Sequence, residues 1–174
     1  STVTQSSLTL DWTASTDNVA VTGYDVYQNG IKINGANVTS TSYNVSGLIA
    51  LTSYDFYVVA KDAAGNVSAA SNTVNVITPD TQAPTAPSGL ASSNLAATSL
   101  TLNWNASTDN VAVTGYDVYQ NGIKINVAAV TVTNYNVTGL SQASAYSFFT
   151  RALDGAGNVS ANSNTIHVTT PDIQ

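Results

Sequence analysis

The side chains in this 174-residue chain that could do chemistry are few and of narrow type. The ten acidic residues are all aspartates, His167 is the single histidine, and cysteine is absent. Without cysteine there can be no disulfide, thiolate nucleophile or Cys-ligated metal. A glycosidase usually needs two carboxylates about 5–10 Å apart in a cleft, whereas these aspartates fall mostly on turns and solvent faces. A Ser–His–Asp triad would depend on His167 alone. We therefore predict that the chain is not an enzyme, with no catalytic residue, cofactor or metal.

The charge balance excludes two further classes of partner. Four lysines and arginines against ten aspartates give a formal net charge of −6. Nucleic-acid binding is carried largely by basic side chains that neutralise phosphates, and polybasic membrane anchors need a basic cluster. No run approaches the roughly 18–20 apolar residues that span a bilayer. We expect neither a nucleic-acid nor a membrane partner.

The elements that position these side chains occur twice. The segment STDNVAVTGYDVYQNGIKIN stands at residues 15–34 and again, unchanged, at residues 107–126, an offset of 92 residues. A period near 90 is too long for a solenoid repeat and fits one small domain. Three of the four prolines lie between the copies, in residues 78–89, which is typical of a semi-rigid connector. We predict a first domain at residues 1–79, a linker at 80–86 and a second domain at 87–174.

Each copy alternates apolar and polar residues with a period of two, which indicates β-strands. In the first copy, strands are expected near residues 8–12, 24–27, 31–34, 43–45, 54–61 and 72–77. Asn29-Gly30 predicts a tight hairpin, because a type I′ turn needs positive φ at two positions. Six or seven short strands separated by frequent turns predict an antiparallel β-sandwich.

These residues also carry a family resemblance. The chain resembles a tandem pair of fibronectin type III domains, which have an immunoglobulin-like, all-β sandwich fold. The motifs are SLTLDW at residues 7–12, GYDVY at 23–27, YDFYVVA at 54–60 and DAAGNVS at 62–68. The second copy has Trp104, Tyr116 and Tyr146 at the corresponding positions. The resemblance is to domains of secreted bacterial chitinases and cellulases, and it implies a secreted, extracellular location.

The first copy departs from the family pattern at its start. Residues 87–90, Pro-Ser-Gly-Leu, are expected to begin strand A of the second domain, and the first copy has no counterpart of residues 86–92. Strand A of the first domain is therefore predicted to be truncated, which leaves the neighbouring strand with an open edge. We expect a monomer unless another chain completes this edge.

Two sets of side chains are candidate binding residues. The first is an aromatic strip that lies opposite in parity to the core residues. A strip of this kind can stack on sugar rings, or it can be a cross-strand pair that only stabilises the sheet. Its members are Tyr27 and Tyr57 in the first copy and Tyr119 and Phe149 in the second.

The second set is polar and lies at one pole of each domain. Aspartate and asparagine oxygens can bind Ca²⁺, which takes six to eight oxygen ligands, but both residues are also ordinary turn formers. In the second domain this pole is expected to face the first domain across the linker. We predict no metal there and an interdomain polar contact formed by Asp109, Asn110, Asp154 and Asn158.

Together these features predict a non-catalytic module that spaces the flanking domains of its parent chain. The resemblance makes that parent a polysaccharide hydrolase, with polysaccharide as a potential partner. Two alternatives stay open. The chain could be a carbohydrate-binding module that uses the aromatic strip, or a segment for cell-surface adhesion or assembly.

Overall fold

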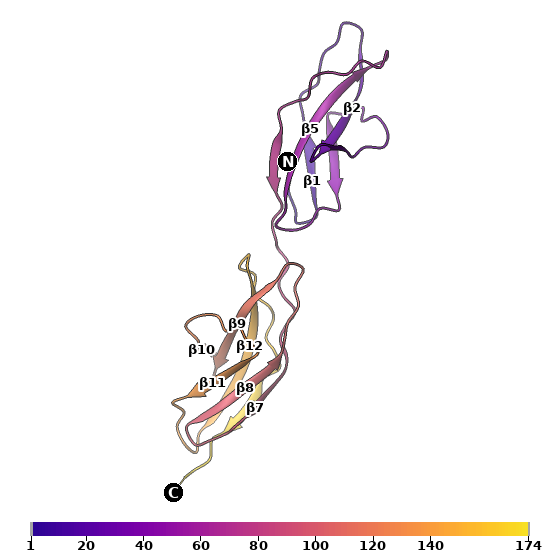
Figure 1. Ribbon diagram of the computed structural model, residues 1–174. Helices are drawn as coiled ribbons and strands as arrows, with labels where there is room; N and C mark the ends of the chain where they lie inside the picture. Colours follow the sequence, from indigo (N-terminus) through magenta and orange to yellow (C-terminus); the bar gives the residue numbers. More distant parts are fainter. Residues whose placement is uncertain (1, 174) are drawn as a thin grey trace. The chain divides into compact units, whose positions relative to one another are not determined.

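The computed structural model describes residues 2–173, and all regular secondary structure in that range is β-strand (Figure 1). The chain divides into two compact units, residues 1–80 and 81–174, called here the first and second units. No helix long and apolar enough to cross a membrane is found among the described residues. All strand pairs are antiparallel, which confirms the predicted all-β antiparallel fold.

The first unit contains two sheets. A two-stranded sheet pairs β1 with β4, and a four-stranded sheet has the order β3-β2-β5-β6. The strands are β1 (Ser7–Asp11), β2 (Val21–Gln28), β3 (Ile31–Lys32), β4 (Ser42–Ser46), β5 (Ser53–Asp62) and β6 (Val74–Ile77). Between β2 and β3, Asn29 and Gly30 have φ of 50° and 79°, the two positive values that the Asn-Gly pair predicts.

The core of the first unit follows from the period-two pattern. Alternate side chains point to opposite faces of a strand, so Tyr54 and Phe56 of β5 are buried while Asp55 between them is exposed. They pack with Leu8 of β1 and Val45 of β4 in one cluster. The hydroxyl of Tyr54 also accepts the N–H of Ile49 at 2.9 Å, which ties β5 to the loop that precedes it.

The second unit has one strand more. Its three-stranded sheet has the order β11-β8-β7, and its four-stranded sheet the order β10-β9-β12-β13. The strands are β7 (Ser88–Ser93), β8 (Ser99–Asn105), β9 (Val113–Gln120), β10 (Ile123–Lys124), β11 (Asn134–Thr138), β12 (Ala145–Asp154) and β13 (Ile166–Thr169). The additional strand, β7, pairs with β8.

The outer edge of β1 is therefore only partly covered. Val3 forms an isolated bridge with Leu8, and the N–H of Thr9 donates to the carbonyl of Thr2 at 3.4 Å. The N–H of Thr4 then donates to the carbonyl of Ser7 at 2.8 Å and closes a turn. Beyond this point, no named strand among the described residues lies on the outer side of β1.

Candidate functional site

The predicted aromatic strip is present in both units as stacked pairs. Tyr27 of β2 lies opposite Tyr57 of β5 in the strand register, and their rings stack at 4.7 Å with 7° between the planes. Tyr119 and Phe149 stack at 4.6 Å and 9° in the second unit. All four side chains are half-buried. Because each ring covers one face of its neighbour, this geometry favours a pair that stabilises the sheet over an open platform for sugars.

The two strips differ in charge. The guanidinium of Arg151 lies 5.2 Å from the ring centre of Tyr119 and 5.7 Å from that of Phe149, within cation–π range. Its Nε donates to Oδ1 of Asn162 at 2.6 Å. At the position of Arg151 the first unit has Val59. Binding by these residues stays a prediction.

A buried polar cluster in the first unit was not identified from the sequence. Asp25, 4% exposed, accepts Nζ of Lys32 at 2.8 Å and Nζ of Lys61 at 2.5 Å. Nδ2 of Asn34 donates to the same carboxylate at 3.2 Å, and its Oδ1 accepts the N–H of Val26 at 2.8 Å. Burial raises the pKa of Asp25, but the hydrogen bonds from Lys32, Lys61 and Asn34 outweigh it and hold the pKa below its ordinary value.

The second unit repeats this cluster with one cation fewer. Asp117 accepts Nζ of Lys124 at 2.7 Å and Nδ2 of Asn126 at 3.2 Å, and Leu153 stands where the first unit has Lys61. Oδ1 of Asn126 accepts the N–H of Val118, and its Nδ2 donates to the carbonyl of Ala128. The cluster therefore joins neighbouring strands and loops, which is a structural role.

The polar side chains at the pole of each unit close turns. Oδ1 of Asp154 accepts the N–H groups of Ala156 and Asn158 at 2.9 and 2.8 Å, and its Oδ2 accepts Nδ2 of Asn158 at 2.7 Å. Burial raises the pKa of Asp154, but the hydrogen bonds from Asn158 and the turn backbone outweigh this effect. The pKa of Asp154 therefore lies below its ordinary value. Asp109 closes a second turn by accepting the N–H groups of Val111 and Ala112.

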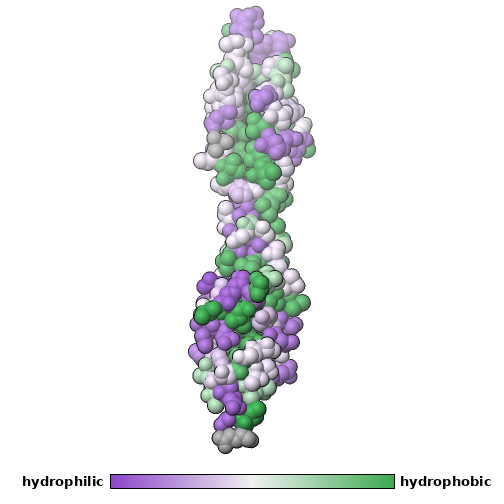
Figure 2. Space-filling model, turned by 90° about the vertical axis from the view of Figure 1, so that its left-hand side faces the viewer, coloured by the Kyte–Doolittle hydropathy of each residue, from purple (hydrophilic) through white to green (hydrophobic). Residues whose placement is uncertain are grey.

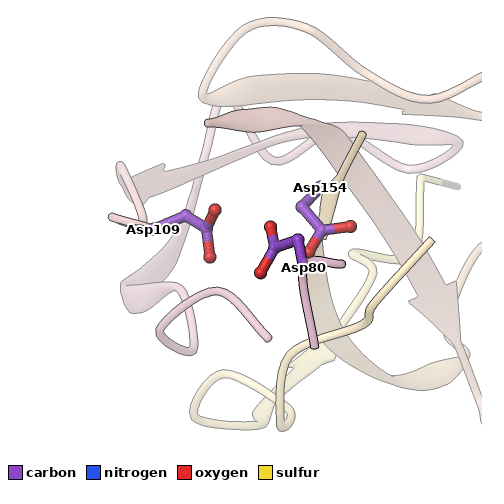
Figure 3. Close-up of side chains that lie close together, drawn as sticks. All are labelled: Asp80, Asp109 and Asp154. Carbon is purple, nitrogen blue, oxygen red and sulfur yellow. The ribbon is translucent and has the colours of Figure 1, made fainter. Parts of the chain in front are cut away.

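The side chains of Asp109 and Asp154 mark this pole of the second unit (Figure 3). Carboxylate oxygens suit Ca²⁺, but carboxylates alone do not identify a metal. Nδ2 of Asn158 also donates to the carbonyl of Gln82 at 3.3 Å. The interdomain contact of Asp109, Asn110, Asp154 and Asn158 stays a prediction.

The first unit also contains a groove that was not predicted from the sequence. It has a volume of about 550 Å³ and runs between β1 and the segment leading into β6. Its apolar lining includes Leu10, Trp12, Phe56 and Val74, and Asp11 is the single acidic residue among its described lining residues. Figure 2 shows apolar side chains at the surface of the first unit. A pair of carboxylates for glycoside hydrolysis is not found among those lining residues.

Comparison with known proteins places both units in one family. The model of the fibronectin type III domain matches residues 1–77 and 85–169. The chain is 55% identical to Chitinase A1 of Niallia circulans, over 97% of this chain and 24% of that enzyme. It is 45% identical to Exoglucanase B of Cellulomonas fimi, over 96% of this chain and 16% of that enzyme.

The chain thus spans less than a quarter of the length of these two relatives. A solved structure of domains A168–A170 of titin covers 86% of this chain, and the chain covers 54% of it, with a TM-score of 0.55 at 19% identity, which supports the fold alone. With two matched regions that together take in nearly the whole sequence, the chain belongs to the fibronectin type III domain family as a tandem pair.

Proposed function

We propose that the chain is a non-catalytic spacer within a secreted bacterial polysaccharide hydrolase, where it positions catalytic and substrate-binding domains. One observation carries this proposal. Nearly the same chain length matches enzymes named for different reactions, a chitinase at 55% identity and an exoglucanase at 45%. A surface specialised for one polymer would not be expected in both. A module whose contribution is length and orientation fits both.

The physical basis is tethering. A catalytic domain joined to a binding domain through a segment of suitable length works at a high effective concentration near an insoluble polymer. Two sandwiches with packed cores hold their own dimensions, and three prolines in residues 78–89 restrict the connector. Only 8% of the residues are charged, so the spacer adds little electrostatic attraction of its own.

The proposal is tested by placing the chain between an endoglucanase catalytic domain and a cellulose-binding domain. Two matched fusion proteins lack it: in one the two domains are joined directly, and in the other a Gly/Ser linker of 174 residues takes its place. We expect the chain to raise hydrolysis of insoluble cellulose over both replacements while leaving hydrolysis of a soluble oligosaccharide unchanged. Equal rates on the insoluble substrate for all three fusion proteins would contradict the spacer role.

A further inference from the structure

The outer face of the four-stranded sheet differs between the two units at one hydrogen-bonded pair of side chains. On β12 the even-numbered side chains from 148 to 154 are buried, so the odd-numbered ones lie on the outer face. Arg151 is one of these outer residues, and Asn162 lies between β12 and β13. The offset of 92 residues places Val59 and Ala70 at the same two positions of the first unit. The arginine and its asparagine partner are therefore present together in the second unit and absent together from the first.

The guanidinium of Arg151 is held in place but is not neutralised. Its Nε donates to Oδ1 of Asn162 at 2.6 Å, and it lies 5.2 and 5.7 Å from the centres of the two stacked rings of this face. Asp117 is opposite Arg151 in the strand register, but its carboxylate accepts Nζ of Lys124 at 2.7 Å. Within residues 2–173, Arg151 forms no ion pair. A guanidinium fixed through Nε still presents its Nη donors, which can bind a carboxylate bidentately.

The basic side chains of the second unit gather on this face. Lys124, Arg151 and His167 are the only lysine, arginine and histidine in residues 81–174. All three occupy outer positions of the sheet, on β10, β12 and β13 respectively. Because Asp117 neutralises Lys124, an uncompensated positive charge remains at Arg151. This charge is opposite in sign to the net charge of the chain, −6, and it attracts an anionic group.

Two further differences give this face the composition of a protein interface. Leu153 stands where the first unit has Lys61, and Ser147 stands where it has Asp55. Leu153 is half-buried and lies on the same side of β12 as Arg151. The cores of protein–protein interfaces are enriched in aromatic residues and arginine and depleted of lysine and aspartate. The second unit therefore has the composition of an interface at positions where the first unit has that of an ordinary surface.

The aromatic rings of this face are already in use. Tyr119 and Phe149 stack on one another at 4.6 Å, and the guanidinium of Arg151 lies over both rings. A sugar ring needs an open aromatic face on which to stack, whereas a carboxylate needs only the Nη donors of the arginine. The geometry therefore favours a carboxylate over a neutral sugar.

We propose that the face formed by Tyr119, Phe149, Arg151 and Leu153 binds an acidic surface of another polypeptide, whose aspartate or glutamate carboxylate pairs with Arg151. Asn162 and the two rings orient the guanidinium before binding, which lowers the entropy cost of ordering it. The rings and the leucine surround the ion pair with apolar contacts that exclude water. Binding at this face does not depend on the spacer role, and its failure would leave that role untouched.

The test uses the fact that Arg151 is the only arginine of the chain, so that its Nε–H gives a single resonance in the NMR spectrum. The full chain, isotopically labelled, is titrated with a short glutamate peptide blocked at both ends and with the matching glutamine peptide. We expect the glutamate peptide to cause saturable shifts of this resonance and of the backbone amides of Tyr119 and Phe149. The amides of Tyr27 and Tyr57 in the first unit are the internal control and should not shift. Absence of a saturable shift with the glutamate peptide, or equal shifts with both peptides, would overturn the proposal.

Two further ligands separate the sources of the carboxylate. Acetate, at the same concentration of carboxylate, and polygalacturonate should both bind more weakly than the glutamate peptide. Equal binding of acetate would reduce the face to a site for any free carboxylate. Tighter binding of polygalacturonate would replace the acidic polypeptide with an acidic polysaccharide. Either result would overturn the proposal.

Variants identify the binding group, with the amides of Tyr119 and Phe149 as the readout. Arg151→Val introduces the residue type of the first unit and should abolish binding of the glutamate peptide. Arg151→Lys keeps the charge but removes the bidentate donors, and should weaken binding about tenfold. Thr169→Ala, at the far end of the same sheet face, is the matched control and should leave binding unchanged. Equal affinity of the parent chain and either Arg151 variant would contradict carboxylate binding at this residue.

Discussion

Asn164 and Leu90 lie 74 residues apart in the chain and are joined by two hydrogen bonds of 2.9 Å, one to the N–H and one to the carbonyl of the leucine. This contact fastens β7 to the segment before β13 and completes the core of the second unit. The corresponding Asn72 of the first unit faces a groove instead. The same asparagine therefore has different surroundings in the two units.

The comparison predicts unequal effects of one substitution. Asn164→Ala leaves the N–H and carbonyl of buried Leu90 without these partners, and should lower the free energy of unfolding of the second unit by about 1–3 kcal/mol. Asn72→Ala should change that of the first unit by less than about 0.5 kcal/mol, as exposed substitutions do. Urea unfolding followed by Trp104 or Trp12, each as the sole tryptophan, measures the two units. Equal losses would show that the asparagines have the same structural role.

The buried carboxylates predict a second difference. Asp25→Asn keeps the shape of the side chain but removes the charge that pairs with Lys32 and Lys61. We expect a loss of about 2 kcal/mol in the first unit, because the lysines are partly solvated and lose less than fully buried partners would. Asp117→Asn, which affects Lys124 alone, should cost less. The same tryptophan-resolved urea unfolding measures both, and a larger loss for Asp117→Asn would contradict this account.

The free energy of unfolding should fall in acid, because three aspartates have lowered pKa values in the folded protein. The pKa values of Asp25, Asp62 and Asp154 all lie below the ordinary value of 3.8. A depressed folded-state pKa contributes stability above the unfolded value, and this contribution is lost as the pH falls through the folded value. Thermal unfolding should therefore be insensitive to these groups at neutral pH and shift to lower temperature below pH 3.8. Asp154→Asn should reduce that shift, and an unchanged acid dependence would exclude Asp154 as a contributor.

The aromatic pairs should be coupled in energy. A double-mutant cycle of Tyr27→Ala and Tyr57→Ala is expected to give a coupling of about 0.5–1.5 kcal/mol, the range for stacked aromatic pairs. The cycle on Tyr119 and Phe149 should give a larger value, because Arg151 lies over both rings. Chemical denaturation of the four proteins in each cycle measures the coupling. Additive losses would show that stacking does not contribute.

Features encoded locally were predictable from the sequence. Alternation near residues 54–61 and the Asn29-Gly30 pair specify a strand and a turn through neighbouring residues alone. The number of short strands and turns predicted the sandwich, and the same alternation placed Tyr27 and Tyr57 opposite in parity to the core residues. The stacking of those two rings follows from the register of β2 and β5, which no local pattern determines.

Contacts between distant segments were not predictable in the same way. Asp25 reads as an outward polar residue of an alternating strand, yet Lys61 and Asn34 reach it from other segments. The bond from Asn164 to Leu90 spans 74 residues. The repeat carried one usable signal: Asp25 and Asn34 lie in the 20-residue segment that is identical in both copies.

The central claim is that the chain contributes distance and orientation, without a polysaccharide site of its own. It is tested most directly by sedimenting the pure 174-residue chain with insoluble chitin and with cellulose, beside an inert protein of similar size. The account predicts that the chain stays in the supernatant with both polymers. Saturable pelleting with either polymer, lost in the Tyr27→Ala/Tyr119→Ala double variant, would contradict it and identify the aromatic strip as a binding site.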